Sequence, residues 1–294
     1  MIWLIGNKGM LGTEVARQLE ENKIDFIGTD RDVDFTDATA TENFTAGKKI
    51  DFIINCAAYT AVDRAESEYE LAEKLNADGP RNIARLAKKI GAKLIHISTD
   101  YVFDGNGDTP RTEDMKINPI GIYGVTKAHG ENAIAEETDE FYIIRTAWLY
   151  GWAGKNFVYT MIRAMNTHDS VKVVNDQKGS PTFAGDLASV ILKIVCGANI
   201  DYGIYHCTDL GEITWWDFTN EIKKQGIECG WITNRDCTVN PCATEEYPTP
   251  AKRPAYSVLS KDKIQKALGI NLPDWKESLG VFLKSKMFDA ERIK

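Results

Sequence analysis

Residues 2–12 read IWLIGNKGMLG, an apolar run followed by Gly6, Gly9 and Gly12 at three-residue spacing. The apolar run predicts a buried strand, and the segment from Met10 to Glu21 has the pattern of a helix. Glycines between a first strand and a helix are typical of a loop that cradles a dinucleotide. Gly6 permits the tight turn, Gly9 lets the backbone approach a pyrophosphate, and Gly12 lets the helix pack close to the sheet. A plain turn without a ligand is the alternative.

Short apolar runs alternate with helical stretches over the first 150 residues. Strands are expected at IWLI, DFIGT, DFIINCA, AKLIHIS and FYIIRTAW, with helices between them. Such alternation predicts an α/β fold built on a Rossmann-type, doubly wound parallel sheet. We expect an NAD(P)-binding domain at residues 1–150 and a smaller α/β substrate-binding domain at residues 151–294. The two should interleave, with a segment at roughly 184–200 returning to the first domain.

The composition is that of a globular protein: 294 residues, 43% of them hydrophobic, with a formal net charge of −8. This acidic balance argues against a nucleic-acid or anionic-membrane partner, which would favour a basic face. The six cysteines form no C-x-x-C pair and fit no familiar zinc spacing, so reduced thiols are expected. The chain opens on a strand pattern without a basic leader, and no apolar run approaches the roughly 18 residues of a membrane span. A cytoplasmic location is expected.

The end of the second strand indicates how a coenzyme would be recognised. Asp30 could hydrogen-bond an adenosine ribose diol, which favours NADH, whereas Arg31 could bind the 2′-phosphate of NADPH. The sequence leaves this choice open. Further candidates for coenzyme contact are Asp34 and Phe35, beside the adenine, and Met10 and Leu11, at the start of the helix.

A candidate catalytic set lies in HISTDYVFDG, residues 96–105, and GIYGVTKAHGE, residues 121–131. Thr99 ends a strand, where ligands of open α/β sheets bind. Tyr123 and Lys127 share a helix face, although an isolated pair of this kind is usually an exposed tyrosine over a lysine stem. Together the three predict proton delivery beside a nicotinamide, with Tyr123 as general acid, Lys127 lowering its pKa, and Thr99 orienting the carbonyl oxygen.

Lys127 has a second expected role, a hydrogen bond to the nicotinamide ribose. Asn76, on the long helix after the third strand, is a candidate for a water relay near Lys127. A surface asparagine without such a role is the alternative.

Seven stretches carry a resemblance that covers nearly the whole chain: GNKGMLG, NCAAYTAVDRAE, STDYVFDG, YGVTK, RTAWLYG, NDQKGSPT and KRPAYSVLS. With them the chain resembles an extended short-chain dehydrogenase/reductase, and more narrowly the dTDP-4-dehydrorhamnose reductase family. The resemblance implies reduction of the 4-keto group of dTDP-4-dehydro-6-deoxy-L-mannose, with NADPH or NADH, to give dTDP-L-rhamnose. A small-molecule nucleotide sugar is then the expected partner.

The resemblance also implies which further residues contact the two ligands. These are Ala57, Ala58 and Tyr59 for the cofactor, and Asp100, Tyr101, Trp148, Gln177, Thr182 and Arg253 for the substrate. Arg253 suits a pyrophosphate because its guanidinium donates in a fork. Some members of the family bind magnesium at a dimer interface; here Glu14 fits one such position, but Gly185 stands where another carboxylate would be. We therefore expect no metal, and either a monomer or a homodimer.

Other enzymes with this fold require different residues, which can be compared with those in this sequence. A dehydratase needs an Asp-Glu pair after the strand-end threonine, whereas Asp100 is followed by Tyr101. An epimerase, or a reductase of another nucleotide-linked 4-ketosugar, would use the same tyrosine and lysine. A non-catalytic, cofactor-binding regulatory subunit, like that of methionine adenosyltransferase, is also similar to this family and remains an alternative.

Overall fold

The computed structural model of the protein describes residues 1–293. Its centre is a six-stranded parallel sheet with the strand order β10-β5-β4-β3-β1-β2. The strands are β1 (Ile2–Ile5), β2 (Phe26–Thr29), β3 (Phe52–Asn55), β4 (Lys93–Thr99), β5 (Phe141–Thr146) and β10 (Gly203–His206). The chain runs outward from β1 to β2 and then crosses back to β3. The order therefore reverses between β1 and β3, which is where such sheets bind ligands, and the predicted Rossmann-type sheet is confirmed.

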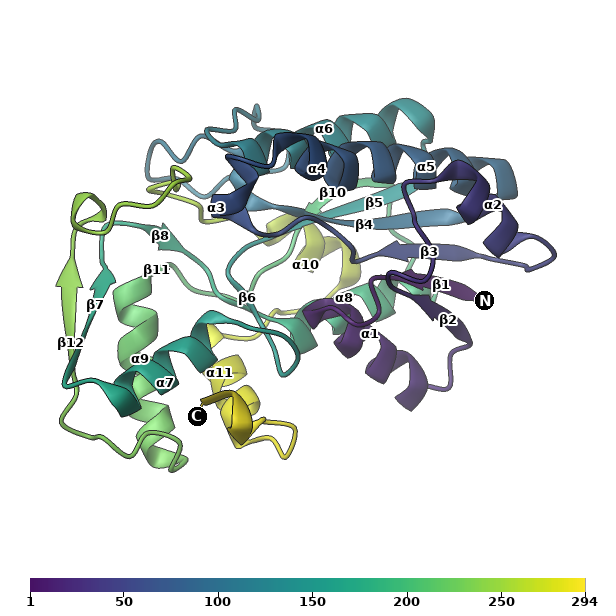
Figure 1. Ribbon diagram of the computed structural model, residues 1–294. Helices are drawn as coiled ribbons and strands as arrows, with labels where there is room; N and C mark the ends of the chain where they lie inside the picture. The colour runs from purple at the N-terminus through teal and green to yellow at the C-terminus, as the bar shows by residue number, and fades with distance from the viewer. Residues whose placement is uncertain (294) are drawn as a thin grey trace.

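Helices cover both faces of the sheet (Figure 1). One face carries α1 (Met10–Glu21), α8 (Ala184–Val195) and α10 (Asp262–Leu268). The other carries α4 (Tyr69–Glu73), a π turn (Lys74–Asp78), α5 (Gly79–Ile90) and α6 (Ile122–Glu137), with α2 (Ala38–Thr45) and α3 (Val62–Ala65) near its edges. None of the helices in residues 1–293 has the length and apolar composition that a membrane span requires.

The sequence of β1 shows why its four residues are all apolar. Successive side chains of a strand point to opposite faces, and here Ile2 and Leu4 pack against α1 and α8, whereas Trp3 and Ile5 pack against α5. A strand that is covered on both faces has no solvent side on which polar residues could alternate.

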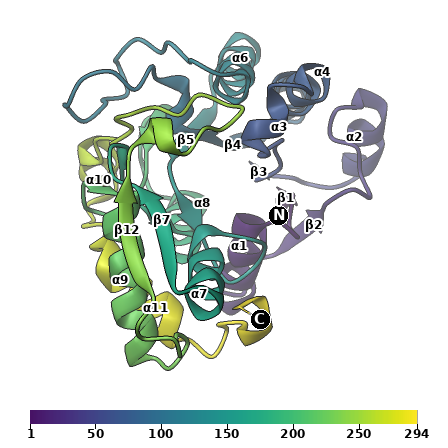
Figure 2. The same ribbon diagram turned by 60° about the vertical axis from the view of Figure 1, so that its left-hand side comes forward.

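A small lobe stands beside the carboxyl ends of the strands (Figure 2). It contains α7 (Phe157–Thr167), α9 (Trp215–Glu228), α11 (Trp275–Lys284) and the parallel pair β7 (Ser170–Val174) and β12 (Thr238–Cys242). Its core is aromatic, with the Tyr150 ring 5.3 Å from that of Phe282 and 5.6 Å from that of Phe218. The short pairs β6 (Leu149–Tyr150) with β9 (Thr182–Phe183), and β8 (Lys178–Gly179) with β11 (Ile213–Thr214), link this lobe to the sheet.

The later half of the chain contributes to both lobes. Helix α8 packs against α1, and β10 adds the outer strand beside β5. The domain limits given above, 1–150 and 151–294 with 184–200 returning, stay a prediction. The last residue of that range, Lys294, lies outside the described residues.

Two glycines of the first loop occupy positions that no larger residue could take. Gly6 has φ of +77°, and a Cβ there would lie 2.8 Å from the backbone nitrogen of Ala57. A Cβ on Gly12 would lie 2.0 Å from the carbonyl oxygen of Gly6. Gly6 therefore allows the loops after β1 and β3 to meet, and Gly12 allows α1 to sit directly behind the loop.

A third close approach positions the helix that carries Tyr123 and Lys127. Gly130 of α6 faces the π turn, and a Cβ there would lie 2.0 Å from the carbonyl oxygen of Asn76. Because both partners are backbone in packed helices, neither can move away cheaply.

We expect Gly130→Ala to lower the free energy of unfolding by about 1–3 kcal/mol through overpacking, although alanine favours helices. Asn132→Ala, at an exposed position of the same helix, is the control and should leave stability unchanged or slightly higher. Urea unfolding of both variants measures this. Equal stabilities would show that α6 and the π turn can separate without cost.

Candidate active site

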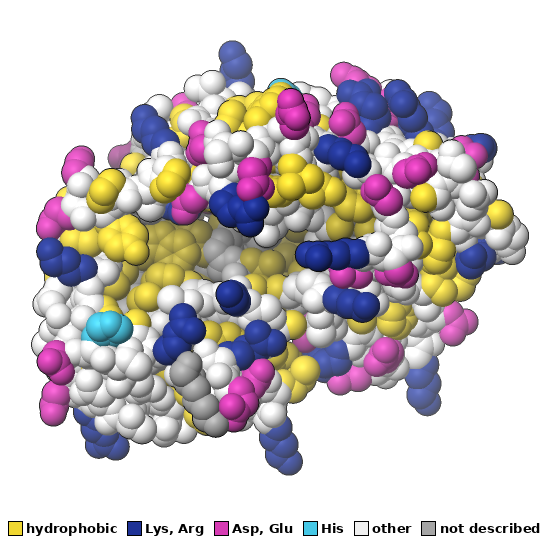
Figure 3. Space-filling view, in the orientation of Figure 1, with side chains coloured by type: hydrophobic (Ala, Val, Ile, Leu, Met, Phe, Trp, Pro, Cys, Tyr) yellow, Lys and Arg dark blue, Asp and Glu magenta, His cyan; other side chains and the backbone are white. Residues whose placement is uncertain are grey.

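A cavity of about 840 Å³ opens at the carboxyl ends of the strands, between the sheet and the small lobe. In the space-filling view it is a hollow with hydrophobic walls (Figure 3). Its lining comes from the segments that follow β1, β2, β3, β4 and β5, together with α6 and the start of α9. Both the reversal of strand order and the lobe interface therefore coincide with this cavity.

Most of the residues predicted from the sequence line this one cavity. They are Gly6, Gly9, Met10, Leu11, Asp30, Arg31, Asp34, Phe35, Ala57, Ala58, Thr99, Asp100, Tyr101, Tyr123, Lys127 and Trp148. Five predicted residues are not part of its lining: Gly12, Tyr59, Gln177, Thr182 and Arg253.

Arg253 nevertheless adjoins the cavity. Its guanidinium donates to the hydroxyl of Tyr101, at 3.0 Å, and to the carboxylate of Asp63, at 2.8 Å. Tyr101 is thus held at the wall of the cavity by a cation from the far end of the chain.

The other predicted residues outside the lining have structural partners. Thr182 is fully buried and donates to the carbonyl oxygen of Ala147 at 2.6 Å. The Gln177 amide donates to the Thr244 hydroxyl at 3.0 Å. The Tyr59 hydroxyl donates to Glu68, away from the cavity lining.

The side chain of Asn76 binds the loop that contains Tyr59. Its oxygen accepts the backbone N–H of Tyr59 at 2.8 Å, and its nitrogen donates to the carbonyl oxygen of Tyr59 and the hydroxyl of Thr126, both at 3.1 Å. Asn76 is fully buried. It therefore holds this loop against α6 and is not a surface asparagine, whereas the water relay stays a prediction.

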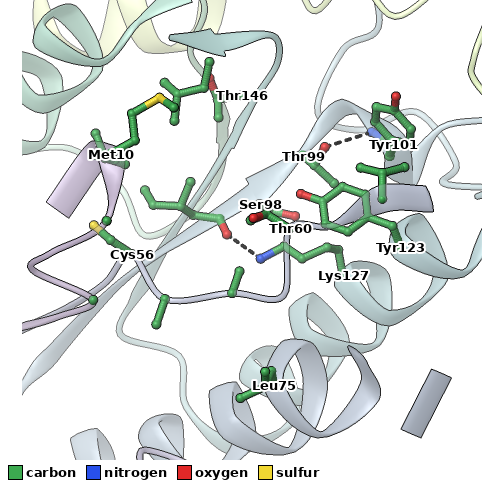
Figure 4. A pocket seen from close by; sticks show the side chains of 18 of the residues that line it. Met10, Cys56, Thr60, Leu75, Ser98, Thr99, Tyr101, Tyr123, Lys127 and Thr146 are labelled. Atoms are coloured by element: carbon green, nitrogen blue, oxygen red, sulfur yellow. Dashed lines mark hydrogen bonds between the residues drawn. The ribbon is translucent and has the colours of Figure 1, made fainter. Parts of the chain in front are cut away.

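Thr99 and Tyr123 lie close together at the end of β4 (Figure 4), and Asp100 follows Thr99 directly. The Thr99 hydroxyl donates to Asp100 Oδ1 at 2.9 Å. Burial raises the pKa of Tyr123 above its usual range, the nearby Asp100 carboxylate adds to this, and a hydrogen bond with Thr99 acts in the opposite direction. The phenol is therefore protonated at neutral pH.

Lys127 points to β4 rather than to the phenol. Its Nζ donates to the carbonyl oxygen of Ile97 at 2.6 Å and lies 3.2 Å from His96 Nε2. Burial lowers the pKa of Lys127 to about 8. The prediction that Lys127 lowers the pKa of Tyr123 is not met in this structure, because the amine is directed to the strand and burial of the phenol dominates.

Two tryptophans form the wall on the small-lobe side. Trp148 has φ of +47°, in the left-handed region that tryptophan rarely adopts. Its indole stacks on that of Trp215, with ring centroids 3.6 Å apart and planes 13° from parallel. Trp215 begins α9 and carries no motif, so only the folded chain reveals it as a cavity residue. Lys155, exposed at the rim, was missed for the same reason.

Within residues 1–293 no group of three or more histidine, cysteine or acidic side chains is arranged to hold a metal ion. Glu14 is paired with Arg17 and accepts from the Gln18 amide at 2.9 Å. The same Gln18 amide donates to the backbone oxygen of Gly185 at 2.8 Å. The Gln18 contacts join α1 directly to α8.

The Rossmann-type sheet, the glycine turn and the threonine, tyrosine and lysine at one cavity define a dehydrogenase/reductase of the short-chain type. The family model described as "RmlD substrate binding domain" matches residues 1–287. The chain belongs to this family, the dTDP-4-dehydrorhamnose reductases, as its sequence motifs predicted.

Several relatives match along nearly the full chain. The dTDP-4-dehydrorhamnose reductase of Aggregatibacter actinomycetemcomitans is 38% identical over 282 residues, which cover 94% of this chain and 96% of that protein. A solved structure of the Clostridium acetobutylicum dTDP-4-dehydrorhamnose reductase is 46% identical, with a TM-score of 0.89 and coverage of 96% of this chain and 98% of that one. The Bacillus anthracis enzyme, solved in complex with NADP, is 36% identical, with a TM-score of 0.89 and coverage of 96% and 97%.

Burial of Asp100 makes the stability of the folded protein depend on pH. It is buried, its Oδ2 has no hydrogen-bond partner among residues 1–293, and burial raises its pKa from 3.8 to about 6. Since the folded protein binds this proton more tightly than the unfolded chain, stability falls as pH rises from about 4 to 6 and stays lower above that.

We expect Asp100→Asn to raise the free energy of unfolding at pH 7.5 by about 3 kcal/mol, following the shift of the Asp100 pKa. At pH 3 the variant and the parent should be nearly alike, because Asp100 is then largely protonated in both the folded and the unfolded protein. Urea unfolding at the two pH values tests this, with Asp108→Asn at an exposed position as the control. A gain of the same size at both pH values would assign the effect to packing.

Proposed function

We propose that this protein reduces the 4-keto group of dTDP-4-dehydro-L-rhamnose to give dTDP-L-rhamnose, with NADPH or NADH as reductant. The observation that carries the proposal is the single cavity shared by the glycine turn, Thr99, Tyr123 and Lys127. The names of the full-length relatives supply the substrate.

We propose that the pyrophosphate of the coenzyme binds at the start of α1. The backbone of Gly9 faces the cavity, and the first turn of the helix contains no acidic residue, so its N–H groups can face a pyrophosphate. Ala57 and Ala58 line the same cavity, and the Ala57 backbone lies next to Gly6. The coenzyme, when bound, supplies the hydride.

Coenzyme choice is assigned to the pair after β2, both of which line the cavity. Asp30 suits a ribose diol, and Arg31 suits a 2′-phosphate. The B. anthracis relative is described with NADP, which favours a phosphate contact by Arg31. We propose that NADPH is used, with NADH accepted through Asp30.

Tyr123 is assigned as the general acid. Its raised pKa keeps the phenol protonated at neutral pH, and a protonated phenol is the form that can give a proton to a carbonyl oxygen. Thr99, hydrogen-bonded at the same place, would orient that oxygen. Lys127, with its amine at the cavity, would reach the nicotinamide ribose.

The sugar is assigned to the space between Asp100 and the two tryptophans. Asp100 lines the cavity beside Ser257, and a sugar hydroxyl could add a donor to its Oδ2. Trp148 offers an apolar face for the hexose, and Arg253 stands beside Tyr101 at the entrance. We assign Gln177 and Thr182 to support of this wall, because their side chains bond to other protein groups.

A second candidate substrate comes from one relative. A Streptomyces antibioticus protein named as a probable dTDP-4,6-dihydroxy-2-methyloxan-3-one 4-ketoreductase is 39% identical over 285 residues, covering 95% of this chain and 93% of that protein. The two sugars differ in ring substituents rather than in the carbonyl that is reduced. Pocket shape, which includes Trp148 and Trp215, would decide between them.

We expect NADPH oxidation that depends on dTDP-4-dehydrorhamnose, because the site combines a coenzyme groove with a positioned acid. Absorbance of the reduced coenzyme, with the ketosugar generated in a coupled assay, measures the rate. The UDP analogue, NADH and dTDP-4,6-dihydroxy-2-methyloxan-3-one, the 4-ketosugar named for the S. antibioticus relative, are run in parallel. If no ketosugar causes oxidation of the reduced coenzyme although the coenzyme binds measurably, the result would instead support a regulatory role.

We expect Tyr123→Phe to lower kcat by a factor on the order of 10² to 10⁴, the range for loss of a positioned acid, while coenzyme affinity stays nearly the same. Tyr142→Phe, which removes a hydroxyl from β5 at the far side of the sheet, is the matched control. Full turnover in the Tyr123 variant would remove this residue from the mechanism.

A further inference from the structure

Residues 243–255 connect the small lobe to the entrance of the cavity, and we call this segment the strap (Figure 1). The strap follows β12 and begins in the small lobe, where the Thr244 hydroxyl donates to Asp176 at 2.6 Å. Its end packs on the segment after β4, where a Cβ on Gly105 would lie 2.5 Å from the Cα of Pro254. The strap is therefore fixed at both ends.

A single carboxylate holds the strap where it reaches the cavity. Asp63 of α3 accepts from the Arg253 guanidinium at 2.8 Å and from the backbone N–H of Ala251 at 3.3 Å. Arg253 also donates to the hydroxyl of Tyr101, at 3.0 Å, and Tyr101 lines the cavity. One contact is made by each Nη of the guanidinium, so the two together fix its plane.

The guanidinium of Arg253 keeps donors for a ligand. An arginine side chain has five N–H groups, and the contacts with Asp63 and Tyr101 use one on each Nη. The Nε–H group and one N–H group on each Nη are left. The side chain is 25% exposed, so these groups can be reached from solvent. Forked donors of this kind suit the oxygens of a phosphate.

Asp63 is itself held in place, because α3 is attached to the helix that carries Tyr123. Ala65 of α3 is fully buried in a cluster that includes Ile122 and Tyr123. Glu66, which follows α3, accepts the backbone N–H of Ile122 at 2.9 Å, in the first turn of α6. A carboxylate at this place satisfies an N–H group that has no partner within the helix. The position of Asp63 is therefore fixed relative to Tyr123.

We propose that Asp63 is a positioning residue that holds Arg253 at the entrance of the cavity, where the guanidinium binds the diphosphate of the nucleotide sugar. The identity of this ligand rests on the proposed function. Asp63 does not touch the ligand in this assignment. It orders a long, flexible side chain before the ligand arrives, which removes part of the entropic cost of binding.

The opposite assignment treats Asp63 as a charge that repels the diphosphate. A carboxylate near an anionic ligand weakens binding by Coulomb repulsion, and its removal would then strengthen binding. The Asp63 side chain is 40% exposed, so water and salt screen its charge. Its contacts with Arg253 and Ala251 act at hydrogen-bond distance, where screening is weak. Positioning should therefore outweigh repulsion.

The first test measures the binding of dTDP by isothermal titration calorimetry, with NADPH present. Arg253→Ala should lower the affinity for dTDP about 10-fold or more, because charge-assisted hydrogen bonds to phosphate are lost. Asp63→Ala should lower it about 3- to 10-fold, which is the cost of ordering one long side chain. Unchanged or tighter binding of dTDP by Asp63→Ala would overturn the proposal.

A double-mutant cycle shows whether Asp63 acts through Arg253. In the Arg253→Ala background, Asp63→Ala should change the affinity for dTDP less than about twofold, because no guanidinium is left to hold. A further loss as large as that in the single variant would show that Asp63 supports the site independently, which contradicts the proposal. Asp63→Leu, similar in size and without an acceptor, serves in the same cycle if the alanine variant does not fold.

The matched control is Glu42→Ala. Glu42 forms an exposed ion pair with Lys89 at 2.8 Å, between α2 and α5, and neither residue lines the cavity. This variant removes one negative charge, as Asp63→Ala does. It should leave the affinity for dTDP unchanged, so a loss in Asp63→Ala alone is not an effect of net charge.

Steady-state kinetics gives a second readout. Asp63→Ala should raise KM for dTDP-4-dehydrorhamnose by the factor found for dTDP, while kcat and the KM for NADPH stay within about twofold, because Asp63 does not touch the reacting atoms. A lower kcat at unchanged KM would refute the assignment. Because dTDP binding is measured without turnover, binding that depends on Asp63 in a protein that reduces no ketosugar would reject the reaction and retain the role of Asp63.

Discussion

The rest of the structure depends on a steric constraint at the turn after β1. Gly6 must adopt a left-handed backbone conformation at +77°, and the loop after β3 approaches so closely that a Cβ would meet Ala57 at 2.8 Å. This contact lies where the strand order reverses, and it brings the start of α1 and the Ala57 loop to one cavity. Without it the two halves of the coenzyme site would stand apart.

A second constraint is electrostatic and fixes the other half of the site. Arg145 of β5 and Glu131 of α6 form a bidentate pair that is at most 3% exposed, and Ser98 of β4 donates to the same carboxylate. Removing one partner of such a buried pair typically costs about 3–5 kcal/mol, because the other charge is left unpaired. The pair therefore locks α6, with Tyr123 and Lys127, to the strand that ends in Thr99.

The two lobes contribute different kinds of residue to the cavity. The sheet supplies short loops with backbone groups and a few titratable side chains, whereas the small lobe supplies aromatic surface through Trp215, which stacks on Trp148. Rigid strand ends suit proton and hydride transfer, which tolerate little error in position. An aromatic wall suits recognition of a sugar ring, where contact area and shape matter more than a single bond.

The sequence by itself determined the sheet, the glycine turn and the candidate catalytic residues, because these depend on local patterns. Apolar runs mark strands buried on both faces, glycine marks backbone that admits no Cβ, and a four-residue spacing places Tyr123 and Lys127 on one face of a helix. The family followed from motifs of the same local kind.

Only the tertiary structure decided what surrounds those residues. Trp215 and Lys155 reach the cavity from segments without a motif. Thr182 is buried with its hydroxyl bonded to Ala147, and Asn76 holds the Tyr59 loop against α6. The surroundings of the Lys127 amine were decided in the same way: the residues beside it, Ile97 and His96, lie on β4, some thirty positions away in the chain. Burial and hydrogen-bond direction set charge in a protein interior, and both are properties of packed neighbours, which no spacing along the chain encodes.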